Sequence, residues 1–234
     1  MNGQEFLELL AEQLVVELQP NKAIRKFTTN PDIIGAYTEA SLRQMVARIV
    51  HPLRVSTGAV ISEQLCSTPN KVAQIDTIIW IPSPAPAIFC AGEFGLVPRG
   101  SCMGIMEIKR SAYSEVGKEL EAALDEKRVL SLVADPLFNT DNSDFPGYPA
   151  LGVVCIREKG KSDRHLDNLI KKGHAIILFE LSGEYLTPCP KDIHRLINFL
   201  IFTRKRAKLW DGEAFVNIPL LKSQSKQDAS DKVG

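Results

Sequence analysis

Apolar positions at helical spacing predict two helices at the start of the chain. The first covers residues 3 to 18 and ends before Pro20, and the second runs from about residue 32 to residue 50. A polar cluster at residues 28 to 32 is typical of a helix start, and His51-Pro52 stops the second helix. We expect the first helix to cover the core or to contact a second copy of the chain. Its apolar face consists of Phe6, Leu7, Leu10, Leu14, Val15 and Leu18.

Short, continuous apolar runs predict buried strands further along the chain. They cover residues 54 to 61, 72 to 81, 102 to 109, 151 to 156 and 175 to 181. Helical patterns follow at residues 113 to 133, 163 to 172 and 193 to 209. Prolines at positions 82, 84 and 86 predict an extended linker after the second strand.

The order of these elements predicts the fold class. After the N-terminal helix the order is α, β, β, β, α, β, α, β, α, which indicates an α/β fold with a central mixed β-sheet flanked by helices. We expect one domain over residues 1 to 222 and a disordered tail over residues 223 to 234, where Ser, Gln, Lys and Asp dominate.

Composition narrows the class of protein. Hydrophobic content of 44% and charged content of 24% are ordinary for a soluble globular protein of 234 residues. Lys+Arg and Asp+Glu both number 28, and the resulting net charge of zero counts mildly against a sequence-blind DNA-binding protein. The five cysteines form no Cys-x-x-Cys pair, which favours reduced thiols. Neither a signal peptide nor a membrane-spanning run is visible, so we expect a cytoplasmic protein.

Two acidic residues interrupt apolar strands and point to chemistry. Asp76 lies in the second predicted strand, and Glu107 lies near the end of the third, two residues before Lys109. A carboxylate in a buried strand is costly unless it is paired, hydrogen-bonded or bound to a metal. Two carboxylates and a lysine on adjacent strands could hold a divalent metal and activate a water for phosphodiester hydrolysis. The alternative is a buried ion-pair cluster that serves stability alone.

The arrangement of these residues resembles a known superfamily. A helix, strands that carry Asp and Glu-x-Lys, and then a helix and a strand are similar to the core of the PD-(D/E)XK nucleases, which have the restriction-endonuclease-like fold. The resemblance covers residues 35 to 156 and rests on Glu39, Asp76, Glu107 and Lys109. Gly35, Gly58 and the Gln74-Ile75-Asp76 segment resemble a bacterial branch of this superfamily.

The resemblance implies both an architecture and an activity. We expect a restriction-endonuclease-like core with an N-terminal helix and a C-terminal βαβα extension. The implied activity is that of an Mg²⁺-dependent endonuclease, with Mn²⁺ as a substitute, which cleaves DNA in a bacterial defence or restriction setting. We expect nucleic acid, and DNA in particular, as the partner, with no membrane contact, and a homodimer or a partner subunit to direct the cleavage.

The chemistry assigns a role to each residue of the central pattern. Asp76 and Glu107 would bind the metal, and the backbone carbonyl of Ile108 could add a third oxygen. Lys109 shares a strand face with Glu107 through the two-residue period, so it would orient the attacking water or help to deprotonate it.

Two further residues are candidates for the same site. Glu39 on the preceding helix could hold a metal-bound water or a second metal, or it could be a solvated helix residue. Gln74 could touch the nucleophile or the phosphate, or it could be a hydrogen-bonding strand residue.

Other motifs carry less information. The four histidines lack metal-site spacing, and neither a phosphate-binding loop nor a Gly-x-Ser-x-Gly elbow is present. The basic run at residues 204 to 208 could contact a phosphate backbone or could complement the C-terminal end of a helix dipole. Two alternatives to the nuclease are open: a catalytically inactive nuclease-like domain that binds nucleic acid or a protein partner, and an unrelated α/β enzyme with Glu107 as general base.

Overall fold

The protein is represented by a computed structural model, which describes residues 26–61, 73–82, 86–98, 101–132, 150–183 and 185–209 together with scattered positions between 5 and 16. The elements in chain order are α3 (Pro31–Val50), β1 (Arg54–Ile61), β2 (Ile75–Trp80), β3 (Phe89–Ala91), β4 (Phe94–Pro98), β5 (Cys102–Ser111), α4 (Val116–Leu132), β6 (Ala150–Glu158), α5 (Arg164–Lys171), β7 (Ala175–Ser182), β8 (Tyr185–Pro188) and α6 (Pro190–Leu209).

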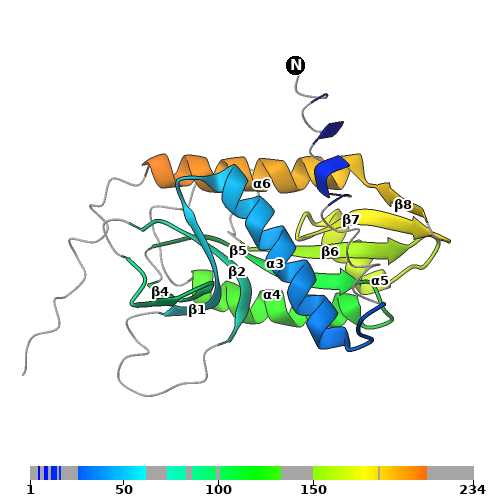
Figure 1. Cartoon of the computed structure of the whole chain (residues 1–234), viewed down its shortest axis with the longest axis horizontal. Helices are drawn as coiled ribbons and strands as arrows, with labels where there is room; N and C mark the ends of the chain where they lie inside the picture. The colour runs from blue at the N-terminus through cyan, green and yellow to red at the C-terminus, as the bar shows by residue number, and fades with distance from the viewer. Residues whose placement is uncertain are drawn as a thin grey trace, which may run out of the picture.

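Eight strands form one mixed sheet in the order β3-β4-β1-β2-β5-β6-β7-β8. Strand β2 pairs antiparallel with β1 and β5, whereas β5, β6 and β7 run parallel to one another. Helices α3 and α6 pack on one face of the sheet, and α4 and α5 pack on the other (Figure 1). The central parallel strands are covered on both faces, which explains their continuous apolar runs. The prediction of an α/β fold with a mixed sheet between helices is confirmed.

Three short strands were not predicted from the sequence: β3 and β8 are the two edge strands, and β4 lies between β3 and β1. Strands β3 and β4 form a hairpin in the region after the prolines, and all three residues of β3 are exposed. Strand β8 has four residues, and none of them is buried. An edge strand that buries no apolar run leaves little pattern to detect. The C-terminal segment is therefore β6-α5-β7-β8-α6 rather than βαβα.

Several expectations lie partly outside the described residues. The described positions between 5 and 16 are helical, and Leu14 belongs to the same core cluster as residues of α3 and α6, as expected for a core-covering helix. Cys66 and the tail from residue 223 lie outside the described residues. The four cysteines in the described part of the chain form no disulfide with one another. Among the helices that the structure describes, none is long and apolar enough to cross a membrane.

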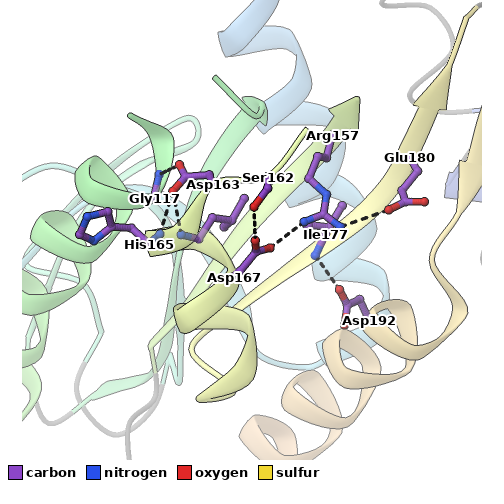
Figure 2. Close-up of polar contacts among 10 residues, drawn as sticks. Gly117, Arg157, Ser162, Asp163, His165, Asp167, Ile177, Glu180 and Asp192 are labelled. Carbon is purple, nitrogen blue, oxygen red and sulfur yellow. Dashed lines mark hydrogen bonds and ion pairs between the residues drawn. The ribbon is translucent and has the colours of Figure 1, made fainter. Parts of the chain in front are cut away.

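Asp163 begins α5 and joins it to α4 (Figure 2). Its Oδ1 accepts hydrogen bonds from the backbone N–H groups of His165 and Leu166 at 2.9 and 3.1 Å, and its Oδ2 accepts one from Gly117 at 2.9 Å. Burial raises the pKa of Asp163, but these three hydrogen bonds outweigh burial, so the pKa lies below its ordinary value of 3.8. The charged carboxylate therefore stabilises the junction of the two helices.

We expect Asp163→Ala to lower the free energy of unfolding by about 1–2 kcal/mol at neutral pH, because the cap of α5 is lost. Asp163→Asn should lower the free energy of unfolding by less, since its amide oxygen can still accept the two hydrogen bonds of the cap. A lowered pKa means that the charge stabilises the fold above the unfolded pKa, and that this contribution disappears as the pH falls through the folded pKa. Urea unfolding at pH 7 and at pH 3 measures this contribution. The difference in free energy of unfolding between wild type and Asp163→Asn should be smaller at pH 3. An equal difference at both pH values would contradict a role for the charge.

Candidate functional site

Strands β2 and β5 separate at the position of Asp76. Their antiparallel register runs from Trp80↔Cys102 to Thr77↔Met106. Beyond this last pair, the backbone N–H of Ile108 on β5 donates to Oδ2 of Asp76, the residue before Thr77 on β2, at 2.8 Å. A side-chain oxygen thus continues the contact between the two strands, and the half-buried Asp76 carboxylate lies where the strands part.

Glu107 and Lys109 lie together on the α4 side of β5. The neighbour of Glu107 on β6 is Gly152, where an added Cβ would lie 2.7 Å from Leu120 of α4. This close approach places the Gly152 position, and Glu107 beside it, on the α4 side of the sheet. Glu107 is only 7% exposed. Its Oε1 lies 3.5 Å from Nζ of Lys109, whose side chain is 26% exposed, so the pair has one buried and one accessible member.

Glu39 lies on α3 within the electrostatic reach of these groups. Its pKa is raised, first by burial and then by the negative charge of Asp76. The charge of Arg43 opposes this shift; Glu107 adds to it and Lys109 reduces it. Charged side chains from α3, β2 and β5 therefore all influence the pKa of Glu39.

The other two predicted site residues lie as follows. Gln74 is exposed and lies just before β2, which begins at Ile75. Ile108 has a buried side chain and contributes its N–H to Asp76. The roles of Gln74 and of the Ile108 carbonyl stay predictions.

The donor set at this position suits a hard divalent cation. Among the described residues, no three or more His, Cys, Asp or Glu side chains are arranged to hold a metal by themselves. An ion here would have Asp76 and Glu107 as its carboxylate ligands, with the Ile108 carbonyl, water and a substrate phosphate completing its shell. Mg²⁺ keeps several waters and needs only one or two protein carboxylates, so this set fits it. Asp76 uses Oδ2 for the Ile108 N–H and leaves Oδ1 for an ion.

Sequence reasoning overlooked Arg43, which touches this site. Its Nη1 donates to the backbone oxygen of Asp76 at 3.0 Å and lies 3.7 Å from Oε2 of Glu39. The signal was present, because a cation one helical turn after Glu39 interrupts the buried face that Leu42 and Val46 form on α3.

Structures of NucC proteins are similar to this chain over most of its length. NucC of E. coli MS115-1 in a cAAA-bound form matches with a TM-score of 0.57 and 18% identity, over 87% of this chain and 91% of that chain. The cAAA-bound NucC of P. aeruginosa ATCC27853 matches with a TM-score of 0.57 and 16% identity, over 87% and 92%. The apo form of the E. coli protein gives a TM-score of 0.53 and 16% identity, over 87% and 93%. No protein-family profile and no curated protein sequence matches the chain.

The chain therefore shares the restriction-endonuclease-like fold of these NucC structures, and the architecture expected from the sequence is confirmed. NucC proteins from two bacteria are among the proteins whose structures share this fold. At 16–18% identity the likeness concerns architecture, so the activity must be argued from the residues of the site.

Proposed function

We propose that this protein is a metal-dependent endonuclease that cleaves DNA in bacterial anti-phage defence. NucC proteins, whose fold it shares, are DNA-cleaving nucleases of such defence. The observation that carries the proposal is local: Asp76, Glu107 and Lys109 meet where β2 and β5 separate. A buried carboxylate and a half-buried one beside a partly accessible amine suit chemistry on a phosphate better than they suit a dry core.

Each residue has a distinct task in the proposed reaction. Asp76 and Glu107 would hold Mg²⁺, or Mn²⁺ in its place. The ion, when bound, acts as a Lewis acid that activates water and offsets negative charge on the phosphate. Lys109, held 3.5 Å from Glu107, would orient the attacking water with its ammonium group and contact the scissile phosphate. Glu39 and Gln74 would contact water or phosphate at the rim.

The same comparison supports the proposed substrate class and cellular setting. DNA is the substrate that we propose, and the cytoplasm is where a defence nuclease would meet it. A second copy of the chain or a partner subunit would direct cleavage. Arg204 and Lys205 on α6 are exposed and could contribute to a phosphate-binding surface.

We expect the full chain to cleave plasmid DNA with Mg²⁺ or Mn²⁺ and not with EDTA. Asp76→Ala and Lys109→Ala should each lower the cleavage rate at least about 10³-fold, which corresponds to about 4 kcal/mol of transition-state stabilisation. Lys118→Ala is the control, because Lys118 is an exposed lysine at the start of α4. Agarose-gel assays give the rates, and circular dichroism checks the fold of each variant.

Two outcomes would count against the proposal. Cleavage that survives in both Asp76→Ala and Lys109→Ala would remove this mechanism. A folded wild-type chain that neither cleaves DNA or RNA nor binds Mn²⁺ would instead favour a catalytically inactive nuclease-like domain.

A further inference from the structure

Arg43 links three separate elements next to the candidate site. Its side chain is 10% exposed, and its Nη1 donates to the backbone oxygen of Asp76 at 3.0 Å. Its Nε and Nη2 both donate to Oε2 of Glu93, at 3.3 and 3.0 Å. Glu93 lies in the turn between β3 and β4. The guanidinium group thus joins α3, the strand of Asp76 and the edge hairpin.

The backbone of Asp76 lies in an irregular stretch of the sheet. On one side, the β1–β2 register shifts between the pairs Ser56↔Ile78 and Gly58↔Ile75. On the other side, the β2–β5 register ends at Thr77. Because Asp76 lies between these two irregularities, regular strand pairing does not hold its carbonyl, and Arg43 supplies the donor.

Arg43 also compensates for negative charge at the site. Its Nη1 lies 3.7 Å from Oε2 of Glu39, one helical turn away. The positive charge of Arg43 lowers the pKa of Glu39, whereas the negative charges of Asp76 and Glu107 raise it. The planar guanidinium group can satisfy a carbonyl and a carboxylate in different directions at once, which an ammonium group does poorly.

We propose that Arg43 is a positioning residue for the nuclease site, and that Glu93 in the β3–β4 turn holds it in place. This inference rests on the proposed function. Arg43 fixes the main chain of Asp76, and the Ile108 N–H fixes its carboxylate, so the two contacts together set the direction of the metal-binding oxygen. Misplacement of a catalytic group by about 1 Å can cost about 10²-fold in rate.

Arg157 provides a matched control for a purely structural arginine. It bridges Asp167 of α5 and Glu180 of β7 at 2.9 and 3.2 Å, and its side chain is 21% exposed (Figure 2). Like Arg43, it is a largely buried arginine with carboxylate partners on other elements, but its partners are not residues of the candidate site. Arg157→Lys should therefore affect stability without affecting the site.

The test compares Arg43→Lys with Arg157→Lys in the full chain. We expect Arg43→Lys to weaken Mn²⁺ binding, measured by calorimetric titration, and to slow plasmid cleavage, each by about 10–100-fold, as is typical of residues that support metal ligands. Arg157→Lys should bind Mn²⁺ and cleave within about twofold of wild type. Glu93→Gln keeps an oxygen that can accept from Arg43. Its Mn²⁺ affinity and its cleavage rate should therefore lie between those of Arg43→Lys and wild type.

Hydrogen exchange without metal supplies a readout that does not depend on activity. If Arg43 fixes Asp76, the Ile108 amide should exchange faster in Arg43→Lys than in Arg157→Lys when the two variants have the same global stability. If Arg43→Lys showed the same Ile108 exchange rate and the same Mn²⁺ affinity as wild type, the role of Arg43 would be overturned and the proposed function would be unaffected. A wild-type chain that binds no Mn²⁺ and cleaves no DNA would overturn the proposed function and this inference with it.

Discussion

Glu107→Gln should abolish Mn²⁺ binding and lower DNA cleavage at least about 10³-fold, a loss of the same order as that expected for Asp76→Ala and Lys109→Ala. The described site offers two carboxylates to an ion, and a hard divalent cation prefers anionic oxygens, so an amide in place of Glu107 removes half of the ligand charge. Gln has the same shape as Glu, so packing around this 7% exposed side chain should survive.

Thermal unfolding in the presence of Mn²⁺ separates this loss from a folding defect. A ligand that binds only the folded state stabilises it by about 2.7 kcal/mol at a concentration of 100 times its dissociation constant. Wild type should show this gain and Glu107→Gln should not. Glu180→Gln is the matched control, because Glu180 is also paired with a basic residue, Arg157, and its substitution should leave the gain intact. Equal stabilisation of Glu107→Gln and wild type by Mn²⁺ would disprove the assignment of Glu107 as a ligand.

Gly117→Ala should cause the largest loss of stability from a single methyl group, about 3 kcal/mol or more. A Cβ at this position would lie 2.3 Å from the backbone nitrogen of Leu166 and 2.8 Å from Oδ1 of Asp163. These atoms belong to the start of α5, so relief requires α4 to move away from α5. That movement would also break the hydrogen bond from Gly117 to Asp163.

Gly35→Ala is the same substitution in a helix with no such neighbour. An added Cβ at Gly35 meets nothing within 4 Å. Alanine in a helix interior is favoured over glycine by about 0.5–1 kcal/mol, so this variant should be more stable than wild type. Urea unfolding of both variants tests the contrast in sign, and destabilisation of similar size at both positions would show that the α4–α5 contact is not responsible.

The buried strands and the site residues on them could be predicted because burial leaves a strong local pattern. Strands β2 and β5 are covered on both faces, so their sequences are almost continuously apolar, and Asp76, Glu107 and Lys109 are conspicuous within them. Strands β3 and β8 could not be predicted in this way, because they have no buried residue and little apolar pattern.

The amino-acid sequence alone predicted the α/β order of the elements, and it singled out two acidic residues and a lysine two positions after one of them. It did so because hydrophobic periodicity and the cost of burying charge act locally along the chain. The sequence did not predict that Arg43 reaches the carbonyl of Asp76 or that Gly117 touches the start of α5; tertiary packing creates both contacts. These contacts join positions 33 and 49 residues apart, and their geometry depends on where the strands part and how the helices pack, which no local pattern encodes.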